Sequence, residues 1–203
     1  FVILLLLKGY SNVHGIDIKE KFNNKFLANL GFNASFNLTD DRPPFEGSYF
    51  DVINSSVVLE HVEDIDLYYQ ESARILKPGG VCFFHFPQRL KPYDSHSKTW
   101  FIHYFPKPIR KVLWDIFARQ GGKSLNNYLY LKMVSTHIRI AKKYFSIVEE
   151  RTDERIKKIH FVNYKGSQKL RMIAFKLMNL RYVGILFIKI FAKIASADLY
   201  LKK

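Results

Sequence analysis

Apolar positions in the first ninety residues recur with two different periods, which predict strands alternating with helices. Short apolar runs predict strands over 12–18, 34–38, 49–58 and 81–86. A helix predicted over 19–30 carries its apolar side chains on one face, at Phe22, Phe26, Leu27 and Leu30. A second predicted helix runs from an Asp64 cap to Leu76, where the sequence Lys-Pro-Gly-Gly ends it.

This alternation predicts an α/β fold: a doubly wound, mostly parallel sheet with helices on both faces. The strand over 81–86 is apolar on both faces, as buried parallel strands are. Ligands of such sheets bind at the carboxyl ends of the strands. The sequence places Asp17, Asn54, Ser55 and the residues after Phe86 at such ends, so we expect a small-molecule site there.

The second half of the chain has a different character. Residues 91–107 are rich in His, Tyr, Phe and Pro and predict a lid or loop. Helices are predicted from Pro108 to Gly121 and over 128–144, and strands over 145–149 and 197–201. The first of these helices gathers its apolar side chains on one face, at Ile109, Val112, Leu113, Ile116 and Phe117.

Residues 170–195 form an apolar run whose internal lysines argue against a membrane span. At helical spacing one face gathers polar and basic residues, interrupted by two apolar ones: Asn179, Arg181, Lys189, Lys193 and Ser196, with Ile185 and Leu186. One interpretation is a helix packed on the domain with a solvated basic face. The other is a helix lying on an anionic membrane surface.

Composition bounds these possibilities. The 203 residues suit a single domain over 1–203, and 48% hydrophobic residues exclude a disordered chain. One cysteine excludes a disulfide scaffold and favours a reducing compartment. The net charge of +14 is uneven, because 1–90 holds 8 basic and 11 acidic residues whereas 91–203 holds 24 and 7. We therefore attribute the excess positive charge of 91–203 either to contact with a binding partner or to a solvated surface, and not to the core.

Two motifs resemble the class I S-adenosylmethionine-dependent methyltransferases. Residues 49–62 read Tyr-Phe-Asp-Val-Ile-Asn-Ser-Ser-Val-Val-Leu-Glu-His-Val, and residues 74–80 read Arg-Ile-Leu-Lys-Pro-Gly-Gly. The resemblance implies a Rossmann-like fold with a helical lid, a C-terminal helical insertion over 153–196, and S-adenosylmethionine as cofactor. Residues 91–106 also resemble a lid of bacterial enzymes of polysaccharide and lipid-glycan synthesis.

The resemblance also implies roles for individual residues. Asp17, followed by Ile18, ends the strand whose acid accepts hydrogen bonds from both ribose hydroxyls. Asp40 matches the acid that meets the adenine amino group. Asn54, Ser55 and Val57 line the cofactor, whereas Glu60 and His61 are assigned mainly to supporting the fold.

The family's glycine-rich turn is absent, since no Gly-x-Gly occurs anywhere in the sequence. The apolar residues 1–7 are too short to span a bilayer and align with the helix that follows that turn. We expect a chain that begins just past the turn, rather than one that lost it. The chain as given is then expected to have an incomplete cofactor site and to be inactive on its own.

Methyl transfer to a hydroxyl needs a base, and histidine is the usual one. His85, His96 and His103 are the candidates, with His96 favoured because Tyr93 and Asp94 lie beside it; for each of them alone, a packing or surface role is the first interpretation. No histidine pair has metal-ligand spacing with a carboxylate, so no metal is expected. Buried Cys82 is assigned to the core.

The sequence therefore predicts a methyltransferase acting on a hydroxyl of a small-molecule, glycan or lipid-linked acceptor. Two alternatives remain: a non-catalytic binding protein with this fold, and an RNA methyltransferase or RNA-binding protein. Membrane contact through 170–195 ranks above nucleic acid as the explanation of the basic half. The expected location is the cytoplasm, with peripheral contact at the inner membrane surface.

Overall fold

The computed structural model describes residues 2–10, 12–17, 34–38, 42–94, 98–117, 129–158, 176 and 181–203. The chain divides into two compact units, 1–49 and 50–203, and each is taken by itself below. The helix predicted over 19–30 lies outside the described residues.

The first unit holds one short helix and a pair of parallel strands. Helix α1 (Val2–Leu7) precedes β1 (Val13–Asp17), which pairs with β2 (Ala34–Leu38) so that Asp17 lies opposite Leu38. Both predicted strands are confirmed. Asp17 is the last residue of β1 and therefore lies at the carboxyl end of this strand.

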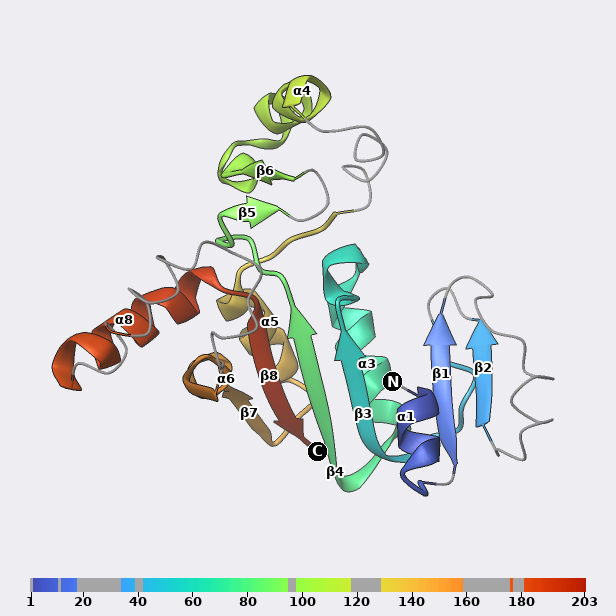
Figure 1. Ribbon diagram of the computed structural model, residues 1–203. Coiled ribbons are helices and arrows are strands. Elements are labelled where there is room, and N and C mark those ends of the chain that lie inside the picture. The colour runs from blue at the N-terminus through green and yellow to red at the C-terminus, as the bar shows by residue number, and fades with distance from the viewer. Residues whose placement is uncertain are drawn as a thin grey trace. The chain divides into compact units, whose positions relative to one another are not determined.

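The second unit is built on a four-stranded sheet. Its strands lie in the order β3 (Phe50–Ser56), β4 (Leu76–Phe86), β8 (Ala197–Lys202) and β7 (Ile147–Glu150) (Figure 1). β3 and β4 are parallel, whereas β8 runs antiparallel to both β4 and β7. The parallel pairs in both units confirm the predicted α/β class.

One face of this sheet carries the core. Alternation along β4 and β8 buries one set of side chains, namely Cys82, Phe84, Phe86, Ala197, Leu199 and Leu201. Helices α3 (Ile65–Ile75) and α5 (Val134–Ala141) cover this face and lie behind the sheet in Figure 1. Burying each large apolar side chain contributes about 1.5–3 kcal/mol. The other set, which includes Phe83 and His85, is left on the opposite face.

Asp64 caps α3 as predicted, since its side chain accepts hydrogen bonds from the amides of Asp66 and Leu67. The strand that follows begins earlier than predicted, because Leu76 already pairs with Phe50. Gly79 takes a positive φ of 78°, and a Cβ on Gly80 would lie 3.0 Å from the Asp51 carbonyl oxygen. The glycines therefore let the strand bulge and continue, instead of serving only to stop the helix.

The helix predicted over 128–144 is shorter, because residues 129–133 form neither helix nor strand. The amide of Tyr130 donates to the Glu60 carbonyl, and the Lys132 carbonyl accepts from the amide of Arg89. These long-range bonds take the backbone groups that a helix would have used internally.

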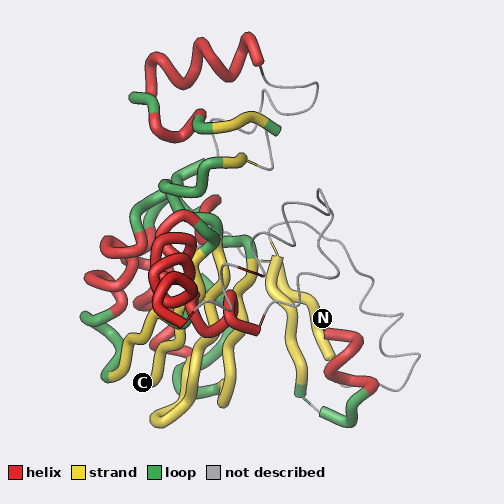
Figure 2. Tube along the Cα trace, turned by 60° about the vertical axis from the view of Figure 1, so that its left-hand side comes forward, coloured by secondary structure: helices red, strands yellow, loops and turns green. Residues whose placement is uncertain are grey.

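The lid extends beyond the carboxyl end of β4, as Figures 1 and 2 show. It consists of β5 (Tyr93–Asp94), β6 (Thr99–Trp100), a 3₁₀ turn η2 (Ile102–Tyr104) and α4 (Lys107–Phe117). Trp114 is fully buried in a small core of its own with Ile102 and Leu129. The lid is thus stabilised by a hydrophobic core of its own.

Helices α6 (Thr152–Lys158) and α8 (Arg181–Ile194) separate β7 from β8, where the C-terminal insertion was predicted. Lys189 and Lys193 are exposed on α8, beside the exposed apolar residues Ile185 and Leu186. Among the described helices, none is long and apolar enough to cross a bilayer.

Candidate functional site

The parallel strands β3 and β4 end at the same edge of the sheet, and the backbone there is strained. Val57, the residue after β3, takes a φ of 60°, which is unusual for a β-branched side chain. Its amide donates a 2.8 Å hydrogen bond to the carbonyl of His85 on β4. Such strain costs about 1–3 kcal/mol and concentrates at functional sites.

Asn54 and Ser55 lie on opposite faces of β3, as strand geometry requires. Asn54 is exposed on the face away from α3 and α5. Ser55 is buried on the helix side, where its hydroxyl accepts a 2.8 Å hydrogen bond from Tyr68. Burial raises the pKa of Tyr68 to about 12, so this phenol stays protonated and donates. The structure thus separates two residues that were predicted to act together.

A cavity of about 170 Å³ opens on the sheet face that carries Asn54. It joins three strands, and its lining includes Asn54, Phe83, His85, Asp198 and Tyr200, with Arg151 beside them. The Arg151 guanidinium lies 3.9 Å from the centre of the Tyr200 ring. Aromatic walls with a few polar groups are the usual composition of a small-molecule site.

His85 and Asp198 are hydrogen-bonded to each other inside this cavity. Residue His85 on β4 lies opposite Asp198 on β8, and His85 Nδ1 is 2.8 Å from Asp198 Oδ1. The other carboxylate oxygen, Oδ2, pairs with Nε of Arg155 on α6. The Asp198 amide also donates to the Thr152 hydroxyl at 3.1 Å. Strand β4 and helix α6 therefore hold the carboxylate in place, and α6 also binds the Asp198 backbone.

The charge of Asp198 fixes the proton on its histidine. Burial opposes ionisation of Asp198, but hydrogen bonds from His85 and Arg155 outweigh it and hold the pKa of this carboxyl below its ordinary value. An ionised carboxylate only accepts hydrogen bonds, so Nδ1 of His85 must donate. In the neutral imidazole Nε2 is then the basic nitrogen. This is the arrangement that prepares a histidine to take a proton.

Glu60, in the 3₁₀ turn η1 (Leu59–His61), is a buried carboxyl close to this edge. It is 1% exposed, and neither carboxyl oxygen has a hydrogen-bond partner within the described structure. Burial raises the pKa of Glu60, against the charges of His61, His85 and Lys91. Its backbone carbonyl anchors Tyr130, which agrees with the supporting role assigned from the sequence.

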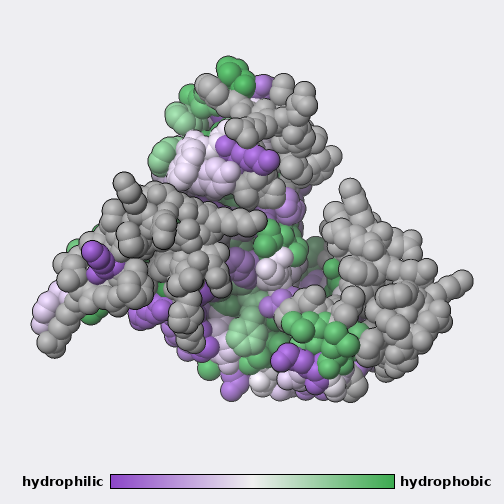
Figure 3. Space-filling view, viewed as in Figure 1, coloured by the Kyte–Doolittle hydropathy of each residue, from purple (hydrophilic) through white to green (hydrophobic). Residues whose placement is uncertain are grey.

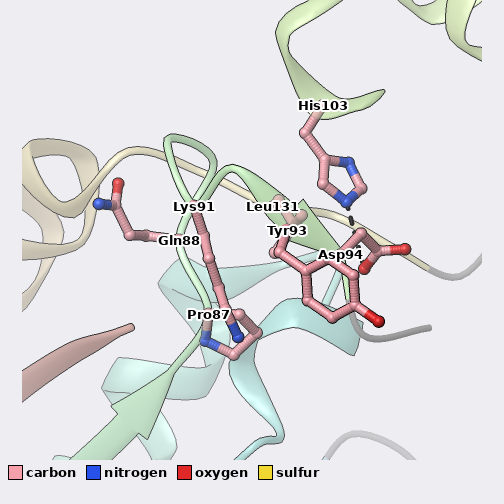
Figure 4. Close-up of a pocket in the computed structure, with 7 residues that line it drawn as sticks. All are labelled: Pro87, Gln88, Lys91, Tyr93, Asp94, His103 and Leu131. Carbon is pink, nitrogen blue, oxygen red and sulfur yellow. Dashed lines mark ion pairs between the residues drawn. The ribbon is translucent and has the colours of Figure 1, made fainter. Parts of the chain in front are cut away.

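His103 is buried in the lid. Its Nε2 lies 3.3 Å from Asp94 Oδ1, and the two side chains border a cavity of only about 10 Å³ (Figure 4). That volume matches one water molecule, so it is too small for an acceptor. Asp94 was expected to accompany His96, which lies outside the described residues. The lid instead brings Asp94 to His103.

The structure describes only some of the remaining predicted site residues. Asp17 ends β1, while Ile18 and Asp40 lie outside the described residues. Among the described residues, no cluster of three or more His, Cys, Asp or Glu side chains could hold a metal ion. Buried Cys82 lies in the core, and burial raises its thiol pKa to about 12.

Sequence reasoning missed Asp198, Arg155 and the cavity they border. One signal was available: Asp198 is the single acidic residue in an alternating strand, on the face opposite Ala197 and Leu199. Its histidine partner lies 113 positions away, and only the sheet register reveals it.

Comparisons with known proteins agree with the predicted class. Residues 1–84 match the family model described as a methyltransferase domain. Over 38 residues the chain is 50% identical to a ubiquinone biosynthesis O-methyltransferase of Chelativorans sp. (strain BNC1), which is 19% of this chain and 15% of that protein. The matched segment thus spans less than a sixth of this curated relative.

Two solved structures establish the fold. An S-adenosylmethionine-dependent methyltransferase from Mesorhizobium loti is 15% identical with a TM-score of 0.57, covering 99% of this chain and 84% of that one. Phosphoethanolamine N-methyltransferase 2 of Haemonchus contortus, in complex with phosphomonomethylethanolamine and S-adenosylhomocysteine, is 18% identical with a TM-score of 0.52. That match covers 98% of this chain and 45% of the other.

Proposed function

We propose that this chain is a class I S-adenosylmethionine-dependent methyltransferase and that it transfers a methyl group to a hydroxyl oxygen; the match of residues 1–84 to a methyltransferase domain and the shared fold support this. The proposed acceptor is a small molecule or a glycan- or lipid-linked compound. The observation that carries the proposal is the His85–Asp198 pair, which opens onto the same cavity as Asn54. The Chelativorans relative, an O-methyltransferase by name, supports oxygen as the target.

S-adenosylmethionine is the cofactor of this family, and when bound it supplies an electrophilic methyl group. The chemistry of Asp17 fits the adenosine part, because a carboxylate at a strand's carboxyl end accepts hydrogen bonds from two ribose hydroxyls. Asn54 and the strained turn at Val57 are proposed to line the cofactor. Ile18, Asp40 and Ser55 stay predictions, and the Ser55 hydroxyl is already used by Tyr68.

The proposed base is His85. Asp198 holds the proton of Nδ1, so Nε2 faces the acceptor as a free lone pair and takes the hydroxyl proton as the oxygen attacks. Asp198 then stabilises the imidazolium that results, and Arg155 keeps the carboxylate oriented. Asp198 and Arg155 are positioning residues in this scheme. His96 and His103 remain the other predicted bases, but the burial of His103 favours His85.

Cofactor affinity tests the first part of the proposal. This test and the turnover tests use a chain that also carries the family's glycine-rich turn, because the cofactor site of the chain as given is expected to be incomplete. Asp17→Asn should weaken binding of S-adenosylhomocysteine at least tenfold, because hydrogen bonds to a charged acceptor are worth about 1.5–3 kcal/mol each. Isothermal titration calorimetry measures the change. Asp51→Asn is the matched control. Asp51 lies near the amino end of strand β3, away from the carboxyl ends at which the cofactor is proposed to bind, so this variant should bind as the wild type does. Equal affinities for the two variants would contradict the role of Asp17.

Peripheral membrane contact through 170–195 is a second, separable part of the proposal. On α8 the large side chains of Tyr182, Ile185, Leu186 and Ile190 are all more than half exposed, with Lys189 and Lys193 beside them. We expect the double variant I185D/L186D to sediment less with phosphatidylglycerol-containing vesicles than the wild type. Equal sedimentation would exclude α8 as a contact.

A further inference from the structure

The lid presents an apolar surface on the outside of the molecule. Three residues on one side of α4 form part of it: Ile109 is 50%, Val112 58% and Ile116 64% exposed. Exposed rings from β6 and η2 extend it, namely Trp100, Phe101, Tyr104 and Phe105. We call these seven residues the lid surface. Apolar residues of α4 lie at the top of the view in Figure 3.

The lid's own core does not use this surface. α4 turns its other side inward, where Trp114 is fully buried and Leu113 packs beside Ile102 and Leu129. The sequence alone grouped Leu113 with Ile109, Val112 and Ile116 on one face. The structure divides that face, so three large apolar side chains point outward at spacings of three and four.

The rings beside α4 form a continuous layer. The rings of Trp100 and Phe101 lie 6.0 Å apart, and those of Phe101 and Tyr104 lie 5.7 Å apart. η2 contacts α4, so the aromatic and aliphatic parts adjoin. Tryptophan and tyrosine are the side chains that concentrate at the boundary between lipid and water, because each joins an apolar ring to a polar group.

Charge indicates which partner fits. The segment 98–117 holds four basic residues and one acidic residue, and the exposed Lys98 and Lys111 flank the apolar positions. A chain with a net charge of +14 opposes a second copy of itself at this surface. An anionic lipid surface is attracted by the lysines and accepts the apolar side chains.

From these observations we propose that the lid surface docks on an anionic membrane, with the outer side of α4 and the rings of β6 and η2 entering the interfacial region. This is a second contact, independent of the one proposed for α8. The lid is tied to the chain that leaves β4, since the Tyr104 hydroxyl donates to the Leu90 carbonyl at 2.6 Å. The proposed docking surface is therefore tied to the segment that follows β4, the strand that carries His85.

The two tryptophans of the chain allow a direct test. Trp100 is 64% exposed on the lid surface, whereas Trp114 is fully buried. Titrating the protein with vesicles of phosphatidylcholine and phosphatidylglycerol should shift the fluorescence to the blue, and the W100F variant should lose that shift. Vesicles of phosphatidylcholine alone should bind at least tenfold more weakly, as should the phosphatidylglycerol-containing vesicles in high salt.

The double variant V112D/I116D should bind anionic vesicles at least tenfold more weakly, with an unchanged circular dichroism spectrum because neither residue contributes to the lid core. I185D/L186D on α8 should keep the Trp100 shift. A shift that persists in W100F, or wild-type vesicle affinity in V112D/I116D, would overturn the proposal. So would a dimer, measured by sedimentation, that V112D/I116D dissociates. Loss of all vesicle binding in I185D/L186D alone would overturn it while supporting α8.

Discussion

His85→Gln is expected to reduce turnover by about 10²- to 10⁴-fold, the usual contribution of a general base. Glutamine has no basic nitrogen to replace Nε2, so the acceptor hydroxyl would have to lose its proton to water. The measurement is the rate of S-adenosylhomocysteine release with a hydroxyl-bearing acceptor that supports turnover. His61→Gln is the matched control, because His61 is exposed in η1 and lies outside the proposed machinery.

Asp198→Asn distinguishes a positioning role from a structural one. An amide at this position no longer fixes the proton on Nδ1 of His85, so turnover should fall and the pH profile of kcat should move. Circular dichroism would show whether β8 still pairs with β4. Reduced turnover with the wild-type pH profile would mean that Asp198 only supports the fold, and unchanged turnover in His85→Gln would remove the proposed base.

Acidification from pH 7 to pH 4 is expected to cost about 3 kcal/mol of folding stability through His137 alone. Burial, with a smaller effect from the charge of Lys132, lowers the pKa of His137 from 6.5 to about 4. The unfolded chain therefore binds the proton first, and stability is lost as the pH falls from 6.5 towards 4. Each pKa unit corresponds to about 1.4 kcal/mol, which sets the size of the loss.

The structural cause of this prediction is the position of His137 in the core. The imidazole is 2% exposed, its ring lies 4.3 Å from that of Phe86, and Nδ1 is 3.2 Å from the Tyr69 hydroxyl. Urea unfolding of the wild type and of His137→Gln over this pH range isolates its share of the slope. Lys132→Gln should reduce the slope slightly. Parallel curves for the wild type and His137→Gln would contradict the prediction.

Much of the sheet was predictable because the local pattern of apolar residues indicates each strand. The runs that became β2 and β8 carry the alternation or continuous apolar character of strands, and Asp64 has the chemistry of a helix cap. The errors arose where contacts with residues distant in the sequence determine the backbone conformation. Residues 129–133 are not helical because backbone groups of this segment bond with Glu60 and Arg89, and no local pattern indicates that.

The candidate site was less predictable for the same reason. Sequence neighbours suggested that Asp94 serves His96, yet the turn at η2 brings His103 to Asp94. His85 was named, but its partner Asp198 depends on which strand lies beside β4. For α4, the sequence periodicity identified the apolar side chains but not which of them are buried. A helix with two apolar sides does not show which side packs against the core.

The place of β8 between β4 and β7 also governs how the second unit folds. Its contacts join positions more than a hundred residues apart, such as His85 and Asp198, so closing the sheet carries a large loop-closure entropy and should be slow. Until residues 197–202 leave the ribosome, β4 and β7 each present an unpaired edge to other chains. The nascent protein is therefore expected to be prone to aggregation until β8 is made.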